Sequence, residues 1–107
     1  MTKRRSIFQS HKSEVQAIRN LVRVLGGSVN VTHQSGRVCG TAGIPDLYIQ
    51  VAGKKLRFWM EVKVGRDKLR QGQKDFIERE RRSGGIVVVG TADDLIRFLK
   101  GQGFAIL

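Results

Sequence analysis

The sequence contains few of the residues with which small proteins build disulfides or zinc sites. Cys39 is the one cysteine, and the two histidines are His11 and His33. A lone cysteine excludes an internal disulfide and a CxxC zinc site, and it is typical of a reducing cytosolic setting. The histidines show no metal-ligand spacing, so we interpret both as surface or loop residues.

Long apolar runs are also absent. No stretch is apolar enough to span a membrane, and the charged N-terminus lacks the hydrophobic core of a signal peptide. We therefore expect a soluble, unsecreted protein. A chain of 107 residues with 40% hydrophobic residues and a single proline is typical of one globular domain. We assign that domain to residues 10–107 and interpret residues 1–9, which contain a basic run, as a mobile arm.

Acidic residues are scarce in comparison with basic ones. The chain has 20 Lys and Arg but only 9 Asp and Glu, which gives a net charge of +11. This excess indicates a polyanionic partner, of which nucleic acid is the commonest, although a basic protein without such a partner would have the same composition. Because acids are few, the inward or clustered positions expected of Glu14, Asp46 and Glu61 are informative.

The pattern over residues 43–63 predicts a β-hairpin with two acids at one end. A turn centred on Gly53 and Lys54, or a loop over residues 52–55, gives one register, because both pair Val51 with Leu56. The next pairs in this register are Ile49 with Phe58, Tyr48 with Trp59 and Leu47 with Met60. Asp46 then lies opposite Glu61.

Lys63 falls on the same face of the strand as Glu61, whereas Val62 points the other way into a core. Facing carboxylates repel, so Asp46 and Glu61 require a proton, a nearby cation or a metal ion. The alternative is an ordinary hairpin whose polar end is solvated.

A helix is predicted over about residues 10–25, followed by a strand over residues 28–33 and a glycine-rich loop over residues 34–43. Glu14 falls on the apolar side of this helix. It therefore lies at the edge of the core, where the helix N-terminus favours a negative charge, or points into a site.

The second half of the chain predicts a helix, a strand and a helix. In the helix over about residues 70–82, Gln73 should face the sheet, either toward a site or as a half-buried amide that bonds the backbone. The apolar run 86–89 predicts a buried strand, parallel to the Glu61 strand through a right-handed crossover. A last helix, capped from Thr91, is predicted over about residues 92–100, and residues 104–107 are a candidate edge strand.

The expected fold is therefore α/β: a mixed central sheet, with a three-strand antiparallel meander and one parallel strand, flanked by helices. Asp46, Glu61 and Lys63 at one strand end suit phosphodiester hydrolysis. In that reaction carboxylates hold divalent ions and a lysine stabilises the phosphate. Oxygen ligands and few histidines point to Mg²⁺ or Mn²⁺.

Pro45-Asp46 and Glu61-Val62-Lys63, with Glu14 on the preceding helix, resemble the PD-(D/E)xK nuclease superfamily and its restriction-endonuclease-like core. More narrowly, the run 43–47, the ExK run and residues 69–76 with Gln73 resemble the VRR-NUC (virus-type replication-repair nuclease) family. The resemblance covers about residues 10–100. The chain departs from many members in having Arg70-Gln71-Gly72 where they have a proline before the helical Gln.

The resemblance implies a role for each of these residues. Asp46 and Glu61 would bind the metal, with the Val62 carbonyl as a further ligand. Lys63 would position the attacking water, Glu14 would complete the acidic site directly or through water, and Gln73 would support it.

The resemblance also implies a stand-alone phage or bacterial type of protein in the bacterial or host cytosol: a homodimeric, structure-selective DNA endonuclease related in behaviour to junction resolvases. RNA or modified DNA as substrate would use the same site. The rival hypothesis is a non-catalytic, basic nucleic-acid-binding protein that retains the fold.

Overall fold

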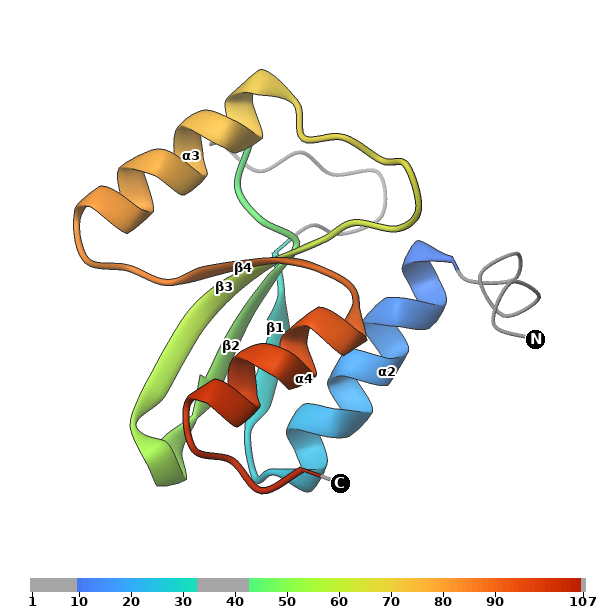
Figure 1. Ribbon diagram of the computed structural model, residues 1–107, viewed down its shortest axis with the longest axis vertical. Coiled ribbons are helices and arrows are strands. Elements are labelled where there is room, and N and C mark those ends of the chain that lie inside the picture. The colour runs from blue at the N-terminus through green and yellow to red at the C-terminus, as the bar shows by residue number, and fades with distance from the viewer. Residues whose placement is uncertain (1–9, 33–42, 107) are drawn as a thin grey trace.

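A computed structural model describes residues 10–32 and 43–106 (Figure 1). The predictions for the arm 1–9, for His33, for Cys39 and for most of the glycine-rich loop lie outside these residues. Within the described ranges, no helix has both the length and the apolar character of a membrane span.

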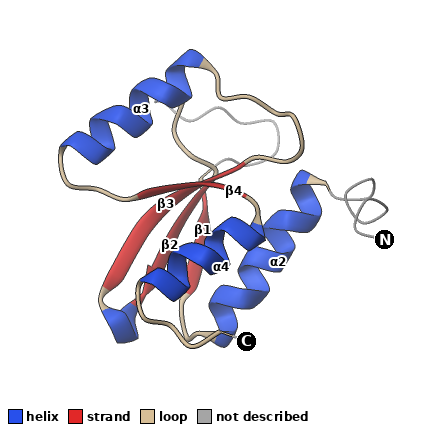
Figure 2. Ribbon diagram, in the orientation of Figure 1, coloured by secondary structure: helices blue, strands red, loops and turns tan. Residues whose placement is uncertain are grey.

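The secondary structure follows the predicted order (Figure 2). The elements are α2 (His11–Val24), β1 (Ser28–Val31), β2 (Leu47–Val51), the 3-10 turn η1 (Ala52–Lys54), β3 (Leu56–Val62), α3 (Gln71–Arg82), β4 (Val87–Gly90) and α4 (Ala92–Gly101). The described strands form one sheet in the order β1-β2-β3-β4. The first three are antiparallel and β4 is parallel to β3, which confirms the expected mixed α/β architecture.

The hairpin of β2 and β3 has the predicted register. Val51 pairs with Leu56, and the ladder continues to Leu47 opposite Met60. The turn combines η1 with Lys55 in the left-handed region at φ 53°. The register matters for the site because it fixes which residues of β3 face each side of the sheet.

The hydrophobic core lies between one face of the sheet and the helices α2 and α4 (Figure 1). Phe58, Met60 and Val62 alternate along β3 and point into this core, where Ile18 of α2 and Leu95 of α4 pack against the sheet. The intervening residues of β3 therefore face the opposite side, where α3 lies. One face of β3 thus packs in the core, and the other carries Arg57, Trp59 and Glu61 on the side of α3.

The C-terminal edge strand predicted over residues 104–107 is wrong for the part that the structure describes. Residues 104–106 are not a strand, and the Phe104 N–H instead donates to the Leu99 carbonyl as the chain turns at the end of α4. Phe104 and Ile106 pack against the core, which accounts for the apolar pattern that suggested a strand.

Candidate active site

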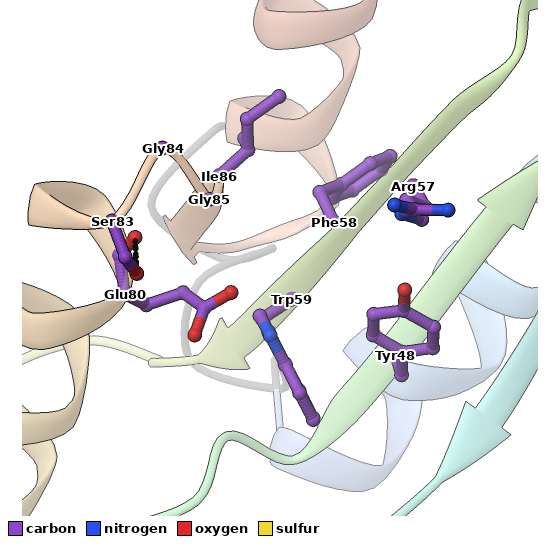
Figure 3. A pocket seen from close by; sticks show the side chains of 9 residues that line it. All are labelled: Tyr48, Arg57, Phe58, Trp59, Glu80, Ser83, Gly84, Gly85 and Ile86. Carbon is purple, nitrogen blue, oxygen red and sulfur yellow. Dashed lines mark hydrogen bonds between the residues drawn. The ribbon is translucent and has the colours of Figure 1, made fainter.

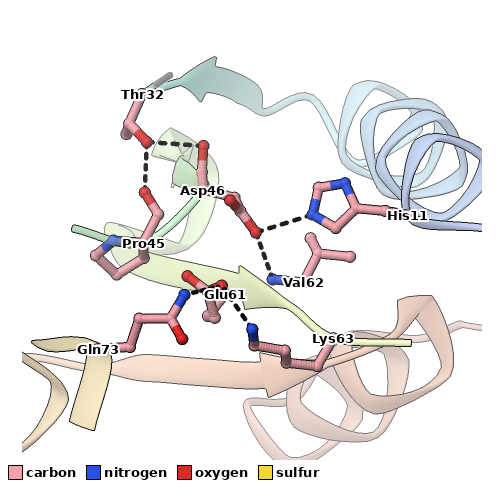
Figure 4. A network of polar contacts seen from close by, with 8 residues as sticks. All are labelled: His11, Thr32, Pro45, Asp46, Glu61, Val62, Lys63 and Gln73. Atoms are coloured by element: carbon pink, nitrogen blue, oxygen red, sulfur yellow. Dashed lines mark hydrogen bonds and ion pairs between the residues drawn. The ribbon is translucent and has the colours of Figure 1, made fainter. Parts of the chain in front are cut away.

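The two predicted acids meet at the end of the hairpin. Asp46 precedes β2, and its Oδ2 accepts a hydrogen bond of 3.0 Å from the Val62 N–H of β3 (Figure 4). The side chain thus bonds the neighbouring strand where the backbone ladder has stopped at Leu47. This contact fixes the Asp46 carboxylate beside Glu61.

The backbone that carries Asp46 is held by Thr32, the residue directly after β1. The Thr32 N–H donates to the Asp46 carbonyl at 2.9 Å, and the Thr32 hydroxyl donates to the carbonyls of Pro45 and Asp46. Pro45 is itself buried. The Pro-Asp step therefore has little freedom to move.

A close backbone approach joins this segment to the start of α3. Gly43 has φ +83°, and a Cβ atom built on it would lie 2.1 Å from the Gly72 carbonyl oxygen. Only glycine combines this conformation with this proximity. The contact brings the segment leading to Asp46 against the helical turn that carries Gln73.

Gln73 is buried and makes two hydrogen bonds. Its Oε1 accepts the Arg70 N–H at 2.7 Å, and its Nε2 donates to Glu61 Oε2 at 2.9 Å. Because a backbone N–H can only donate, the first bond fixes the orientation of the amide and therefore the second. The prediction that Gln73 faces the sheet is confirmed, and α3 begins at Gln71 without the proline.

Glu61 is 3% exposed. Besides Gln73, its Oε2 has the Lys63 Nζ at 3.7 Å, whereas its Oε1 is buried with no hydrogen-bond partner in the described ranges. Burial, and then the negative charge of Asp46, raise the pKa of the Glu61 carboxyl from 4.5 to about 7, against the opposing effect of Lys63. A buried carboxylate with a free oxygen and a nearby like charge favours an added cation.

A pocket of about 280 Å³ opens over these groups. Five predicted residues line it: Asp46, Glu61, Val62, Lys63 and Gln73. Lys68 and Arg70 add positive charge to its wall, while Asp67 adds a further acid. The pocket therefore combines carboxylates with several cations, as binding of a metal ion and a phosphate requires.

Glu14 is buried at 6% exposure but does not line this pocket. Its Oε1 accepts the Ala92 N–H at 2.8 Å, at the first residue of α4. The prediction that Glu14 faces inward is confirmed. Its part in the site stays a prediction, and the structure places its carboxylate at a helix N-terminus, where a negative charge is stabilised.

The sequence interpretation of His11 missed its place in the site. His11 is exposed, as expected, but its Nε2 lies 3.1 Å from Asp46 Oδ2, and it lines the pocket. His11 precedes Glu14 by three residues and therefore shares its helix face, but this spacing alone does not show that His11 reaches Asp46. Its distance of 35 residues from Asp46 in the chain concealed the contact.

The donor set fits a hard divalent cation. Within residues 10–32 and 43–106, no group of three or more His, Cys, Asp or Glu side chains could enclose a metal. Two adjacent carboxylates, one with an unpartnered oxygen, are instead typical of Mg²⁺ or Mn²⁺ sites that retain several waters. The residues present thus permit Mg²⁺ or Mn²⁺, and the metal itself stays a prediction.

Comparison with known proteins gives one informative likeness. No family model matches the sequence, and no curated protein matches it. A solved structure described as a VRR-NUC domain matches this fold with a TM-score of 0.66 and 26% sequence identity. The match covers 86% of this chain and 97% of the other.

Proposed function

The chain has a VRR-NUC domain, and on that premise we propose that it is a divalent-metal-dependent, structure-selective DNA endonuclease. The fold and the likeness support a nuclease domain. The observation that carries the proposal further is the Glu61 carboxylate, which is buried beside Asp46 and has an oxygen with no partner among the described residues. A bound cation stabilises the ionised form of such a buried and partly unpaired carboxylate.

In this proposal Asp46 and Glu61 hold Mg²⁺ or Mn²⁺, with the Val62 carbonyl as a further ligand and Glu14 contributing through water. When bound, the ion lowers the pKa of a coordinated water and screens charge on the phosphate. Gln73 contributes by orienting the Glu61 carboxylate through Nε2.

Lys63 is the proposed catalytic cation. Its side chain is one-fifth exposed and lines the pocket, so its ammonium can reach solvent and a bound phosphate. There it donates hydrogen bonds to the attacking water or to the phosphate oxygens that gain charge. Lys68 and Arg70, on the same pocket wall, bind the neighbouring phosphates of the strand.

DNA is the proposed partner because the chain carries a charge of +11 and its pocket is lined by cations. A homodimer would place two such sites on one substrate, so that both strands of a branched or junction DNA are cut. Replication, repair or recombination would supply such substrates.

The test compares cleavage of branched, duplex and single-stranded DNA, and of RNA, in Mg²⁺, in Mn²⁺ and in chelator. Wild-type protein should cut DNA only with metal. Asp46→Asn should lose at least about a hundredfold in rate, because it weakens the metal site. Asp93→Asn, an exposed acid on α4, is the matched control and should cut normally. Equal cleavage by Asp46→Asn would refute the assignment.

The second candidate, a non-catalytic DNA-binding protein, is favoured by the basic composition alone. It predicts salt-sensitive binding without any metal dependence. Binding with no turnover across the metals and substrates above would support it against the nuclease.

A further inference from the structure

A second cavity has a volume of about 440 Å³ (Figure 3). It lies on the same side of the sheet as the candidate active site, because Trp59 of its lining and Glu61 are two residues apart on β3. Tyr48 and Trp59 form its sheet wall, and the Ser83–Gly84–Gly85 turn after α3 forms the opposite wall. The proposed cleavage chemistry uses none of these residues. A cavity of this volume can accommodate a ring the size of a nucleobase with its sugar.

The two aromatic rings are held in place but are not buried. Tyr48 and Trp59 pair across β2 and β3 with ring centroids 4.7 Å apart and an interplanar angle of 55°. The ring of Phe76, on α3, lies edge-on to that of Trp59, with the ring centroids 5.4 Å apart. Both cavity rings are only half-buried, in contrast to Phe58 and Met60 on the core face of β3. Ring surface is thus available for stacking.

The polar groups around these rings have no partner within the part of the chain that the structure describes. This applies to the Arg57 guanidinium, the Trp59 indole N–H and the Glu80 carboxylate. The cavity therefore offers a cation, a donor and a charged acceptor beside two rings.

Glu80 is directed into this cavity by the following turn. A Cβ atom on Gly85 would lie 2.3 Å from Glu80 Oε2, so the carboxylate occupies the space that a side chain at position 85 would fill. Gly84 adopts φ +91°, which allows the chain to turn there. Figure 3 shows the Glu80 carboxylate directed toward the Trp59 side chain.

The cavity also lies close to the metal-binding carboxylates. Trp59 and Glu61 are two residues apart on β3 and point to the same side, which separates their Cα atoms by about 6.6 Å. A DNA strand with one phosphate over Glu61 therefore has the base of a neighbouring nucleotide within reach of Trp59.

We propose that this cavity binds an unpaired nucleobase of the DNA substrate, and that Glu80 selects bases that present an amino group. This inference rests on the proposed function, because it takes DNA as the ligand. The base stacks on Trp59 and Tyr48, the Glu80 carboxylate accepts hydrogen bonds from the exocyclic amine, and Arg57 contacts the adjoining phosphate. Cytosine has a donor at the position where thymine has a carbonyl oxygen, so Glu80 favours the former. Such a site selects DNA with unpaired bases, as branched structures have.

Trp59 is the only tryptophan in the sequence, so its fluorescence reports directly on this cavity. The test titrates Asp46→Asn protein, in chelator, with short single-stranded oligo(dC), oligo(dT) and an abasic strand of equal length. Oligo(dC) should quench Trp59 and bind about tenfold more tightly than the abasic strand, which is the effect expected from stacking of one base.

Two variants and a control sharpen the test. Tyr48→Ala should lose most of the advantage of oligo(dC) over the abasic strand, and Tyr48→Phe should retain it. Glu80→Ala should remove the preference for oligo(dC) over oligo(dT). Lys100→Ala, an exposed cation on α4, should lose only general affinity. Thermal melting verifies that each variant is folded.

Equal binding of the abasic strand and oligo(dC) by the folded protein would overturn the proposal. The proposal would also be overturned if Trp59 fluorescence changed with protein concentration alone and Tyr48→Ala no longer formed a dimer. Those two results would assign the cavity to contact with a second copy of the chain. A protein that binds oligo(dC) through Trp59 but cuts no DNA would refute the nuclease function and leave the base site standing. Metal-dependent cleavage without any dependence of binding on the base would refute the base site and leave the nuclease function standing.

Discussion

Gln73 donates a hydrogen bond of 2.9 Å to Glu61 and simultaneously accepts the Arg70 N–H at the start of its own helix. One side chain thus couples the first turn of α3 to the buried carboxylate. Because the backbone bond fixes the amide, the orientation of the carboxylate depends on where α3 begins. This relationship gives the first prediction.

Gln73→Ala should lower the metal-dependent cleavage rate by about 10- to 100-fold, the effect expected when a residue that orients a metal ligand is removed. Gln71→Ala, which removes an exposed amide that bonds Asp75 on the same helix, is the control and should retain activity. The measurements are cleavage rates and Mn²⁺ affinity. A normal Mn²⁺ affinity in Gln73→Ala would show that the amide does not position Glu61.

The raised pKa of Glu61 predicts a pH dependence of stability. The folded protein holds this proton more tightly than the unfolded chain, so the stabilisation is fully present below about pH 4.5 and is lost as the pH rises through about 7. The loss is on the order of 3 kcal/mol. Chemical denaturation without metal should show this decline in wild type, and Glu61→Gln should show much less of it.

Added Mn²⁺ should reverse this pH dependence. The ion binds the ionised carboxylate, so its stabilising effect on unfolding should increase between pH 5.5 and 7.5 as the Glu61 proton is displaced. An effect of Mn²⁺ that is equal at both pH values would contradict the assignment of Glu61 as a metal ligand.

Two substitutions of Glu14 separate its structural role from its proposed role in the site. Glu14→Ala removes the acceptor of the Ala92 N–H and should cost roughly 1–3 kcal/mol of stability. Glu14→Gln retains an oxygen acceptor and should melt near wild type, but it should cleave more slowly if the charge serves the metal. Wild-type cleavage by Glu14→Gln would remove Glu14 from the site.

Gly43→Ala should destabilise the protein by at least about 2 kcal/mol, because the added methyl group meets the Gly72 carbonyl and the φ value is unfavourable. The same change should slow cleavage by displacing the start of α3 from Asp46. Gly53→Ala has open space around it and is the matched control, expected to be nearly neutral. Thermal melting and cleavage assays report the two effects separately.

The hairpin and its polar face could be predicted from sequence because strand alternation and register are local. Once Val51 pairs with Leu56, the face of Glu61 and Lys63 follows. The facing of Gln73 followed in the same way from helical spacing. These predictions needed no knowledge of how the elements pack together.

The contacts between distant elements could not be predicted in this way. The approach of His11 to Asp46 and of Gly43 to Gly72 depends on the angles at which α2 and α3 cross the sheet, and composition does not reveal these. The prediction of an edge strand at the C-terminus was wrong for a related reason. An apolar run that packs under a helix end has the same pattern as a strand.

The alternation along β3 also determines which changes of chain length the protein can accept. Arg57, Trp59, Glu61 and Lys63 succeed one another on one side, while Phe58, Met60 and Val62 fill the core. An insertion or deletion of one residue within β3 would exchange these two sets beyond the point of change, turning charged side chains such as Glu61 inward and apolar groups outward. Length variation should therefore be confined to the turn over residues 52–55, and β3 itself should keep a constant length.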